Sequence, residues 1–482
     1  MAADLGFEPR HTESESAVLP LHKSAMNKQY YTHPARSCQA FFEKNKKKTG
    51  GLIPARKYAT LIAANGKGVF AMIENKALVE RFFRYVRIDT QSDEESKTQP
   101  STAKQHDLAK VLYRELLELG LDAAYDDAHC CVYAVLPGTG PALGFIAHMD
   151  TSPSASGANV QPRIEENYPG GDIVLRPKGE GEDAILLSPA QFPDLNRHIG
   201  EDLIVTDGTT LLGADDKAGV AEIMSLLAYY AAHPELPHRT ICAAFTPDEE
   251  VGRGTEHFDT ERFGAKEAYT VDGGKLGEIE YECFNAAAAT VTIRGRSVHP
   301  GYAKDAMLSA LNVAMEFHEK LPAAERPEHT EGYEGYYHLD RMEGDVEQTT
   351  LHYIIRDHDS ARFEQRKRTL QTAADAVNET YRAFLGGDAV ALNVRDQYYN
   401  MALLLRDHMH LVTNAEDVFR SLGVTPAVVP IRGGTDGAML TYRGIPCPNL
   451  CTGGYNFHGR FEYASVQEME TCVKVLIKLA AV

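Results

Sequence analysis

The chain has 482 residues, of which 43% are apolar and 24% are charged, and it carries a formal net charge of −19. At about 100–200 residues per domain, this length predicts two to four domains with a sizeable core. The composition excludes collagen-like and wholly disordered chains, and no apolar run reaches the roughly 18–20 residues that span a bilayer. The acidic excess disfavours nucleic acid and anionic membranes, so we predict neither as a partner.

Eight cysteines are spread along the chain without a CxxC pair. Cys447 and Cys451 have a CxxxC spacing, but no matching Cys/His pair follows, which disfavours a structural zinc knuckle. Because disulfides are rare in the cytosol, reduced thiols in a cytoplasmic protein are the simpler interpretation.

Residues 1–71 differ from the rest of the chain, with 11 Lys/Arg against 5 Asp/Glu. They show no sustained apolar periodicity and lack the apolar stretch of about 7–15 residues that marks a secretory signal. A transit peptide is disfavoured by the acidic residues. We interpret 1–71 as a disordered extension or as a mis-assigned start, with the true start at Met72.

Helical and strand patterns alternate from residue 72 to about 284. Apolar residues at helical spacing predict helices around 78–86, 108–119 and 223–230. Short apolar runs predict buried strands at 131–136, 143–147, 240–245 and 268–271. This alternation indicates an α/β fold whose sheet carries helices on both faces.

The pattern changes near residue 285. Alternating residues predict strands at 287–294, 351–355 and 389–394, and helices are predicted at 305–320 and 360–384. The implied β-α-β-β-α-β order is typical of a small α+β, ferredoxin-like domain. The first pattern returns at about 400 and ends in a helix around 469–477. We therefore predict one domain, 72–284 with 398–482, interrupted by a second, 285–397.

Residues that can bind metals follow the predicted buried strands. His148 and Asp150 follow 143–147, Glu249 and Glu250 follow 240–245, and Asp272 follows 268–271. In open α/β sheets ligands bind beyond the carboxyl ends of the strands, so these side chains are expected to share one crevice. Further candidates are the adjacent Asp215 and Asp216, ahead of a helix, and His458, in a late glycine-rich loop.

Each of these motifs alone has a simpler interpretation: a capped strand end, a solvated turn or an exposed charged face. Their combination, in order and at strand ends, points to a metal centre. Imidazole and carboxylate suit zinc, with manganese or cobalt as substitutes, whereas calcium is disfavoured by the two histidines. Two ions about 3.5–4 Å apart could share one carboxylate and one water, and a glutamate that binds no metal could transfer the proton.

At this point the chain, over roughly 72–482, resembles the M20 family of metallopeptidases. The resemblance rests on 148–151 (HMDT), 212–219 (LGADDKAG), 247–252 (PDEEVG) and 269–274 (YTVDGG). It continues through 298–301 (VHPG), 353–357 (YIIRD), 431–437 (IRGGTDG) and 453–459 (GGYNFHG). The strings 166–172 (ENYPGGD) and 331–335 (EGYEG) are similar to those of the tripeptide aminopeptidases within this family.

The resemblance implies a zinc-peptidase-like catalytic domain with a lid at 285–397 and two zinc ions per chain. His148, Glu250, Asp272 and His458 would be metal ligands, and Asp215 would bridge both ions. Asp150 would orient the His148 ring, and Glu249 would be the general base and acid. The family often has a cis peptide bond at the bridging aspartate, here between Asp215 and Asp216.

Three further residues are candidates for substrate contacts. By resemblance, His299 would help to stabilise the oxyanion, although a surface turn before Pro300 is an alternative. Arg356 and Arg432 are candidates to bind the free carboxylate of the substrate, because guanidinium groups suit that geometry. For each arginine an ordinary structural salt bridge is nearly as good an explanation.

The implied activity is release of the N-terminal residue from tripeptides, by attack of a hydroxide shared by the two metals. Alternatives with the same ligands are a dipeptidase, a carboxypeptidase and an N-acyl amino-acid deacylase. A non-catalytic binding protein is disfavoured because every ligand position and the base are filled. Lys275, where a third glycine is common, and the N-terminal segment depart from the family pattern. A homodimer is plausible by resemblance.

Overall fold

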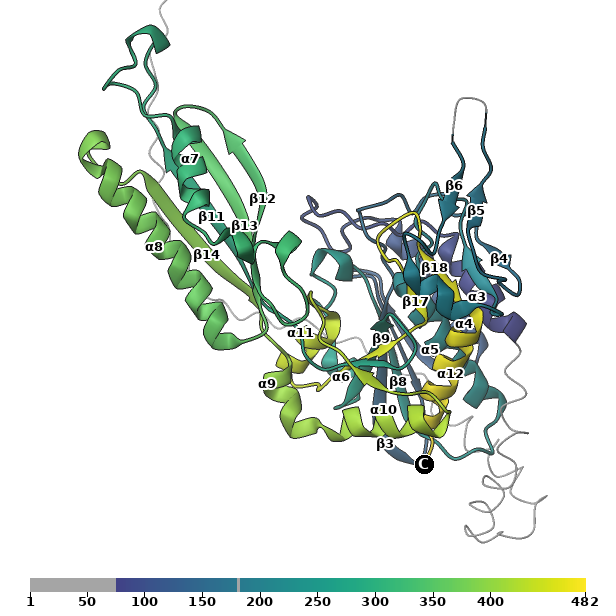
Figure 1. Ribbon diagram of the computed structural model, residues 1–482. Helices are drawn as coiled ribbons and strands as arrows, with labels where there is room; N and C mark the ends of the chain where they lie inside the picture. The colour runs from purple at the N-terminus through teal and green to yellow at the C-terminus, as the bar shows by residue number, and fades with distance from the viewer. Residues whose placement is uncertain (1–74, 180–182) are drawn as a thin grey trace, which may run out of the picture. The chain divides into compact units, whose positions relative to one another are not determined.

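The computed structural model describes residues 75–179 and 183–482, so the interpretation of 1–71 lies outside the described residues. A mixed sheet with the strand order β1-β2-β8-β3-β9-β16-β10-β15 lies at the centre of the larger part (Figure 1). Its strands are β1 (Asp122–Asp126), β2 (Cys131–Leu136), β3 (Gly140–His148), β8 (Arg239–Thr246), β9 (Ala268–Gly273), β10 (Glu278–Glu280), β15 (Ala427–Val428) and β16 (Asn449–Cys451). Strands β8, β3, β9 and β16 run parallel to one another, whereas β1 and β2 form an antiparallel edge.

Helices cover both faces of this sheet because its central strands are apolar on both sides. In β3, Phe145 and Ala147 belong to the core that includes α5, whereas Ile146 belongs to a second core with Phe263 and Leu440. The first core is built with α3 (Asn75–Val86), α4 (Gln105–Glu118), α5 (Ala214–Ala232), α10 (His410–Ser421) and α12 (Val466–Ala480). The second is built with α6 (Thr260–Phe263) and α11 (Asp436–Tyr442). The predicted α/β fold with helices on both faces is confirmed.

Outside residues 285–398, the described chain also forms two smaller sheets. One has the order β17-β18-β7-β4 and the other pairs β5 with β6. Their bounds are β4 (Arg163–Glu165), β5 (Ile173–Arg176), β6 (Ile185–Leu187), β7 (Leu203–Val205), β17 (Gly454–Tyr455) and β18 (Tyr463–Ser465). Strand β18 leads directly into α12, so the loop between β17 and β18, which contains His458, is held at both ends.

Residues 285–398 form an antiparallel sheet with the order β12-β13-β11-β14. Its strands are β11 (Asn285–Arg294), β12 (Tyr336–Gly344), β13 (Gln348–Asp357) and β14 (Val390–Tyr398), and one face is covered by α7 (Ala310–Glu319) and α8 (Ser360–Leu385) (Figure 1). In β13, Leu351, Tyr353 and Ile355 alternate into a separate apolar core. The chain order β-α-β-β-α-β is the one predicted.

Two details differ from the sequence-based expectation. The helix expected over 305–320 begins at Ala310, because residues 304–306 form a turn and Leu308 pairs with Arg296 in an antiparallel bridge. The strand β12 had not been located in the sequence, since its outer half is solvent-exposed and lacks an apolar face.

Candidate active site

The parallel strands bring two predicted site residues to one edge of the sheet. His148 is the last residue of β3 and pairs in register with Thr246, the last residue of β8. Asp272 lies near the end of β9, the strand that flanks β3 on the other side. His148 Nε2 lies 3.4 Å from Asp272 Oδ1. The two side chains therefore face one another at the carboxyl ends of the strands, where α/β folds bind their ligands.

Asp215 lies at the start of α5, where the backbone is not yet helical. Gly213 has φ 82°, in the left-handed region that favours glycine, and Asp215 has φ −84° and ψ 108°. The peptide bond between Asp215 and Asp216 is cis, as the family resemblance implied. One carboxylate oxygen of Asp215 lies 2.9 Å from His148 Nε2, and the other lies 3.1 Å from His458 Nε2.

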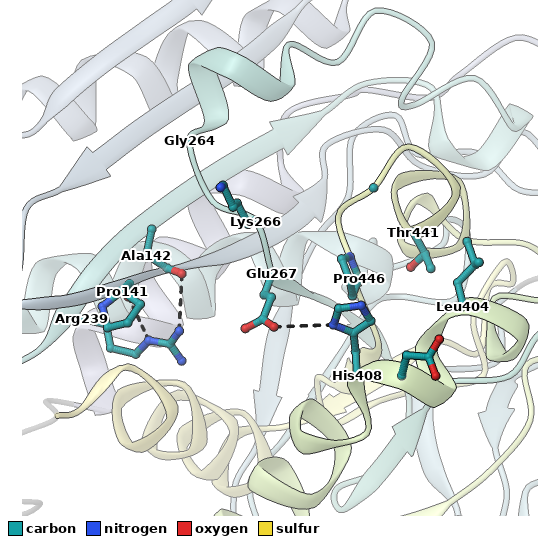
Figure 2. A pocket seen from close by; sticks show the side chains of 12 residues that line it. Pro141, Ala142, Arg239, Gly264, Lys266, Glu267, Leu404, His408, Thr441 and Pro446 are labelled. Atoms are coloured by element: carbon teal, nitrogen blue, oxygen red, sulfur yellow. Dashed lines mark hydrogen bonds and ion pairs between the residues drawn. The ribbon is translucent and has the colours of Figure 1, made fainter.

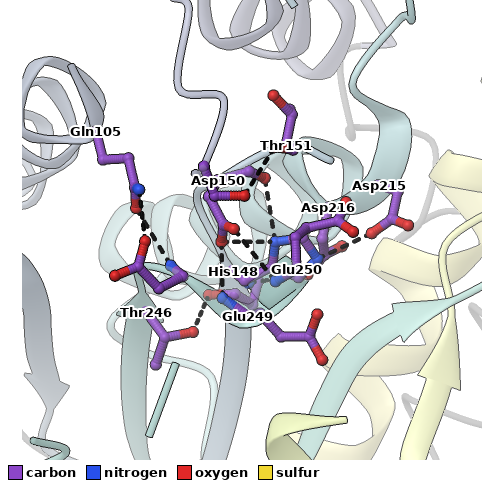
Figure 3. A network of polar contacts seen from close by, with 12 residues as sticks. Gln105, His148, Asp150, Thr151, Asp215, Asp216, Thr246, Glu249 and Glu250 are labelled. Atoms are coloured by element: carbon purple, nitrogen blue, oxygen red, sulfur yellow. Dashed lines mark hydrogen bonds and ion pairs between the residues drawn. The ribbon is translucent and has the colours of Figure 1, made fainter. Parts of the chain in front are cut away.

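Glu249 and Glu250 form a short 3₁₀ turn directly after β8, and Asp150 fixes this turn. The backbone N–H groups of Glu249 and Glu250 donate to the two carboxylate oxygens of Asp150, at 3.0 and 3.2 Å. Asp150 Oδ1 also lies 3.3 Å from His148 Nδ1. Asp150 is fully buried, so it links the His148 ring to the turn that carries both glutamates (Figure 3).

His458 completes the cluster from the loop between β17 and β18. Its backbone has φ 62°, a left-handed conformation that is costly for a residue with a side chain and is concentrated at functional sites. Its Nε2 lies 3.0 Å from Glu250 Oε2 and 3.1 Å from Asp215 Oδ2. The five predicted ligands therefore meet around the two oxygens of Asp215: His148 and Asp272 on one side, His458 and Glu250 on the other.

The cluster fits a pair of divalent cations. Ligand atoms about 2.0–2.2 Å from one tetrahedral ion lie roughly 3.3–3.6 Å apart, close to the observed separations of 2.9–3.4 Å. The side chain of Glu250 is only 4% exposed, yet its Oε1 atom has no hydrogen-bond partner. Buried carboxylates that outnumber their cationic partners carry a large desolvation cost, which bound cations would relieve.

The pKa values of the cluster reflect this excess of buried carboxylate. Burial raises the pKa of Glu250 and of Asp272 to about 7 in each case, and it raises that of Glu249 well above its usual range. Hydrogen bonds that the His458 ring donates to Asp215 and Glu250 raise the pKa of His458 to about 11. Burial opposes a charged imidazole at His148, but the charge of Asp272 and bonds to Asp150 and Asp215 raise its pKa nevertheless. Burial thus disfavours the ionised forms of Glu249, Glu250 and Asp272.

Among the described residues, no interaction joins the cluster to the three predicted substrate contacts, His299, Arg356 and Arg432. His299 is exposed and its Nδ1 accepts a hydrogen bond from Gly301 N. Arg356 donates to Ala287 O, Ile355 O and Gln397 Oε1. Arg432 donates to the carbonyl oxygens of residues 330, 332 and 334. The structure therefore gives both arginines structural partners, and their substrate roles stay predictions.

Sequence reasoning missed Glu462, which holds the loop that presents Asp215. Its carboxylate accepts hydrogen bonds from the backbone N–H groups of Leu212, Gly213 and Asp215, at 2.7, 2.8 and 3.1 Å. Burial raises the pKa of Glu462 to about 7. No local pattern marks this residue.

Asn449 was missed for the same reason. Its Oδ1 accepts from Asp272 N at 3.2 Å, and its amide donates to Glu280 Oε2 at 2.6 Å. Asn449 thereby links Asp272, near the end of β9, to the carboxylate of Glu280 on β10. These contacts appear only once β16 is placed between β9 and β10.

Comparison with known proteins places this arrangement in a family. Residues 281–384 match the model of the peptidase dimerisation domain. The chain is 51% identical over 410 residues to peptidase T of Alkaliphilus oremlandii, covering 84% of this chain and 98% of that protein. It is 53% identical over 408 residues to peptidase T of Desulfitobacterium hafniense, covering 97% of that protein. The chain belongs to the peptidase T family.

Solved structures share the fold of this peptidase T family member. An aminopeptidase PepT from Bacillus cereus superposes with a TM-score of 0.66 at 24% identity, covering 85% of this chain and 98% of that one. A tripeptidase from Staphylococcus aureus superposes with a TM-score of 0.65 at 24% identity, and the match covers 85% of this chain and 99% of that one. The expected fold class, a zinc-peptidase-like domain interrupted by an α+β domain, is confirmed. Among the described residues, no helix is long and apolar enough to cross a bilayer.

Proposed function

We propose that this chain is a zinc-dependent aminopeptidase that releases the N-terminal residue from tripeptides. The observation that carries the proposal is the position of Asp215, whose two oxygens each face a different histidine while Asp272 and Glu250 lie on opposite sides. One carboxylate shared between two ligand sets is the arrangement that a pair of metal ions requires. Similarity over 97–98% of the length of two peptidase T relatives supports the substrate class.

The ligands on one side would be His148 and Asp272, and those on the other His458 and Glu250, with Asp215 common to both. Bound cations would supply positive charge that polarises the scissile carbonyl and acidifies the attacking water. Zinc suits this mixture of imidazole and carboxylate, and manganese or cobalt are possible substitutes.

Glu249 is the proposed general base and acid. Its backbone is fixed by Asp150, so its carboxylate is held beside the ligand Glu250 without an assigned partner of its own among the described residues. Burial raises the pKa of Glu249, which strengthens it as a proton acceptor. It would take the proton of the attacking water and deliver it to the nitrogen of the leaving dipeptide.

Asp150 would act as a positioning residue. It contacts His148 Nδ1 with the carboxylate that also holds the Glu249–Glu250 turn. A histidine that binds a metal through Nε2 is normally oriented by a carboxylate or carbonyl at Nδ1, and Asp150 offers both.

Two of the three proposed substrate contacts, His299 and Arg356, come from the domain at 285–397, which would be the lid, and the third, Arg432, comes from 398–482. His299 would stabilise the oxyanion, and Arg356 and Arg432 would bind the free carboxylate of the tripeptide. The separate apolar core of this region and the match to the dimerisation domain support a distinct domain and a homodimer. The seven cysteines in the described residues are all free, which supports a cytoplasmic location.

A substrate panel tests the proposed activity. The zinc-loaded protein would be assayed on tripeptides, on the matching dipeptides and tetrapeptides, and on N-acylated amino acids. We expect hydrolysis of tripeptides with release of the first residue, and no hydrolysis of a tripeptide whose amino terminus is acetylated. Preference for N-acylated substrates would contradict the aminopeptidase while leaving the metal centre in place.

A further inference from the structure

A second group of metal-binding side chains lies outside the candidate active site. It consists of Glu267, His408 and His410, whose ligand atoms all lie within 4.8 Å of one another. Glu267 Oε1 is 2.9 Å from His410 Nε2 and 3.7 Å from His408 Nδ1. One carboxylate oxygen thus faces two imidazoles, and all three side chains are between 28% and 49% exposed, so an ion can reach them from solvent.

This group lies at the opposite end of the sheet from the candidate active site. Glu267 immediately precedes β9, whereas Asp272 lies near the end of that strand. Five residues at about 3.3 Å each separate the two positions by roughly 17 Å, which is too far for one ion to be shared. The two groups are therefore independent sites.

A cavity of about 790 Å³ adjoins the group, lined by Glu267 and His408 together with Ala142, Arg239, Lys266 and Asp407 (Figure 2). The Arg239 side chain donates to Pro141 O and Ala142 O, so its guanidinium is held against the start of β3. Asp407 adds a second carboxylate to the cavity wall. The cavity leaves space for water at the open coordination positions of an ion.

The donor set selects the kind of ion. Two imidazoles and a carboxylate suit zinc and other late first-row divalent metals, whereas calcium and magnesium prefer oxygen ligands only. Three protein ligands plus a water is a common zinc arrangement, in which ligand atoms lie about 3.4 Å apart. The observed 2.9 and 3.7 Å bracket this value.

We propose that Glu267, His408 and His410 form a binding site for a divalent transition metal, with zinc as the fitting ion. The two histidines flank the start of α10, and Glu267 leads into β9. A bound ion would therefore tie the segment 406–410 to the edge of the central sheet. It would stabilise the folded chain by mass action, since the unfolded chain does not present the three ligands together.

The test counts zinc bound to the full-length protein by equilibrium dialysis at micromolar free zinc, followed by elemental analysis. Wild type is compared with a His408→Ala/His410→Ala double variant. A matched control, His129→Ala/His257→Ala, removes another histidine pair, whose rings stack at 4.0 Å and in which His129 also pairs with a carboxylate. We expect wild type and the control to bind one equivalent more than the double variant.

The difference between variants does not depend on how many ions the candidate active site holds, so failure here is separate from failure of the proposed function. Glu267→Gln keeps the side-chain shape but removes the charge, and it should raise the Kd of this equivalent at least tenfold, about 1.4 kcal/mol. Equal zinc content in wild type and the double variant would overturn the proposal. So would an equal loss in the control, which would indicate non-specific binding to surface histidines.

Discussion

The Oδ2 atom of Asp215 lies 3.1 Å from Nε2 of His458, although the two residues are 243 positions apart in the chain. The other oxygen of Asp215 faces His148 at 2.9 Å. This carboxylate therefore joins ligands from β3 to a ligand from the loop before β18. Its removal should affect both halves of the cluster at once.

Asp215→Ala is expected to lose metal and activity together. Without the shared carboxylate, neither ligand pair is complete, so the zinc bound to the cluster should fall from two equivalents to at most one weakly held equivalent. Turnover should fall at least about a thousandfold. Elemental analysis and a tripeptide assay would check this, with the exposed Asp417→Ala as the control. Full zinc content in Asp215→Ala would contradict the bridging role.

Glu249→Ala should separate chemistry from metal binding. We expect turnover to fall by about two to four orders of magnitude, because the proton carrier is removed, while metal content stays at the wild-type level. Glu256→Ala, an exposed glutamate on the following turn, is the matched control and should be fully active. Near-normal turnover in Glu249→Ala would assign the base elsewhere.

Glu462→Gln tests the support behind Asp215. The amide retains one acceptor oxygen where the carboxylate serves three backbone N–H groups, so the loop at 212–215 loses charge-assisted hydrogen bonds. We expect the affinity of the cluster for zinc to fall about 10–100-fold, as for other residues that orient metal ligands. Glu470→Gln, a buried glutamate on α12, should leave the affinity unchanged. An unchanged Kd in Glu462→Gln would limit Glu462 to a role in stability.

Glu280 should make stability depend on pH. Burial raises its pKa from 4.5 to about 8, so the folded state holds the proton more tightly than the unfolded chain does. Stability contributed by the protonated form is therefore complete below pH 4.5 and is lost as the pH rises through about 8. Glutamine accepts the hydrogen bond from Asn449 without carrying a charge. The free energy of unfolding of Glu280→Gln should therefore exceed that of wild type across this pH range.

Urea denaturation at pH 5 and pH 8 measures the effect. The difference in the free energy of unfolding between Glu280→Gln and wild type should be on the order of a few kcal/mol larger at pH 8 than at pH 5. Glu282→Gln, the partly exposed neighbour, should show the same difference from wild type at both values. A gain that does not change with pH would show that Glu280 is not held protonated in the fold.

Arg356 and Arg432 can be tested by the charge of the substrate. If either guanidinium binds the free carboxylate, its replacement by glutamine should raise KM for a tripeptide at least about tenfold, yet leave KM for the tripeptide amide unchanged. Equal effects on both substrates would show a structural role. For Arg432 this would match the hydrogen bonds to the 330–334 loop.

The sequence was enough to predict that the candidate ligands lie together where metal-binding side chains coincide with the ends of predicted strands. His148 ends a buried strand, Asp272 lies near the end of another, and Glu249 and Glu250 follow a third by a few residues, so short sequence patterns place them at one edge of the sheet. The ferredoxin-like order of 285–398 was likewise predictable, because Leu351, Tyr353 and Ile355 alternate with more exposed residues.

The remainder depended on contacts between distant segments. In the sequence nothing distinguishes Glu462 from an ordinary surface charge. Its hydrogen bond with Leu212 N joins residues 250 positions apart, so only the fold reveals it. Asn449 acquires its role only from the neighbours of β16 in the sheet. The late start of α7 results from the bridge between Arg296 and Leu308, which no helical periodicity can reveal. The group of Glu267 with His408 and His410 joins two segments that carry no shared motif.

The measurement that tests the account most directly is anomalous diffraction at the zinc edge from crystals of the zinc-loaded protein. We predict two peaks about 3.5–4 Å apart at the cluster, one beside His148 and Asp272, one beside Glu250 and His458, with Asp215 touching both. A single peak there, or zinc bound to other side chains while these five stay unoccupied, would contradict the account.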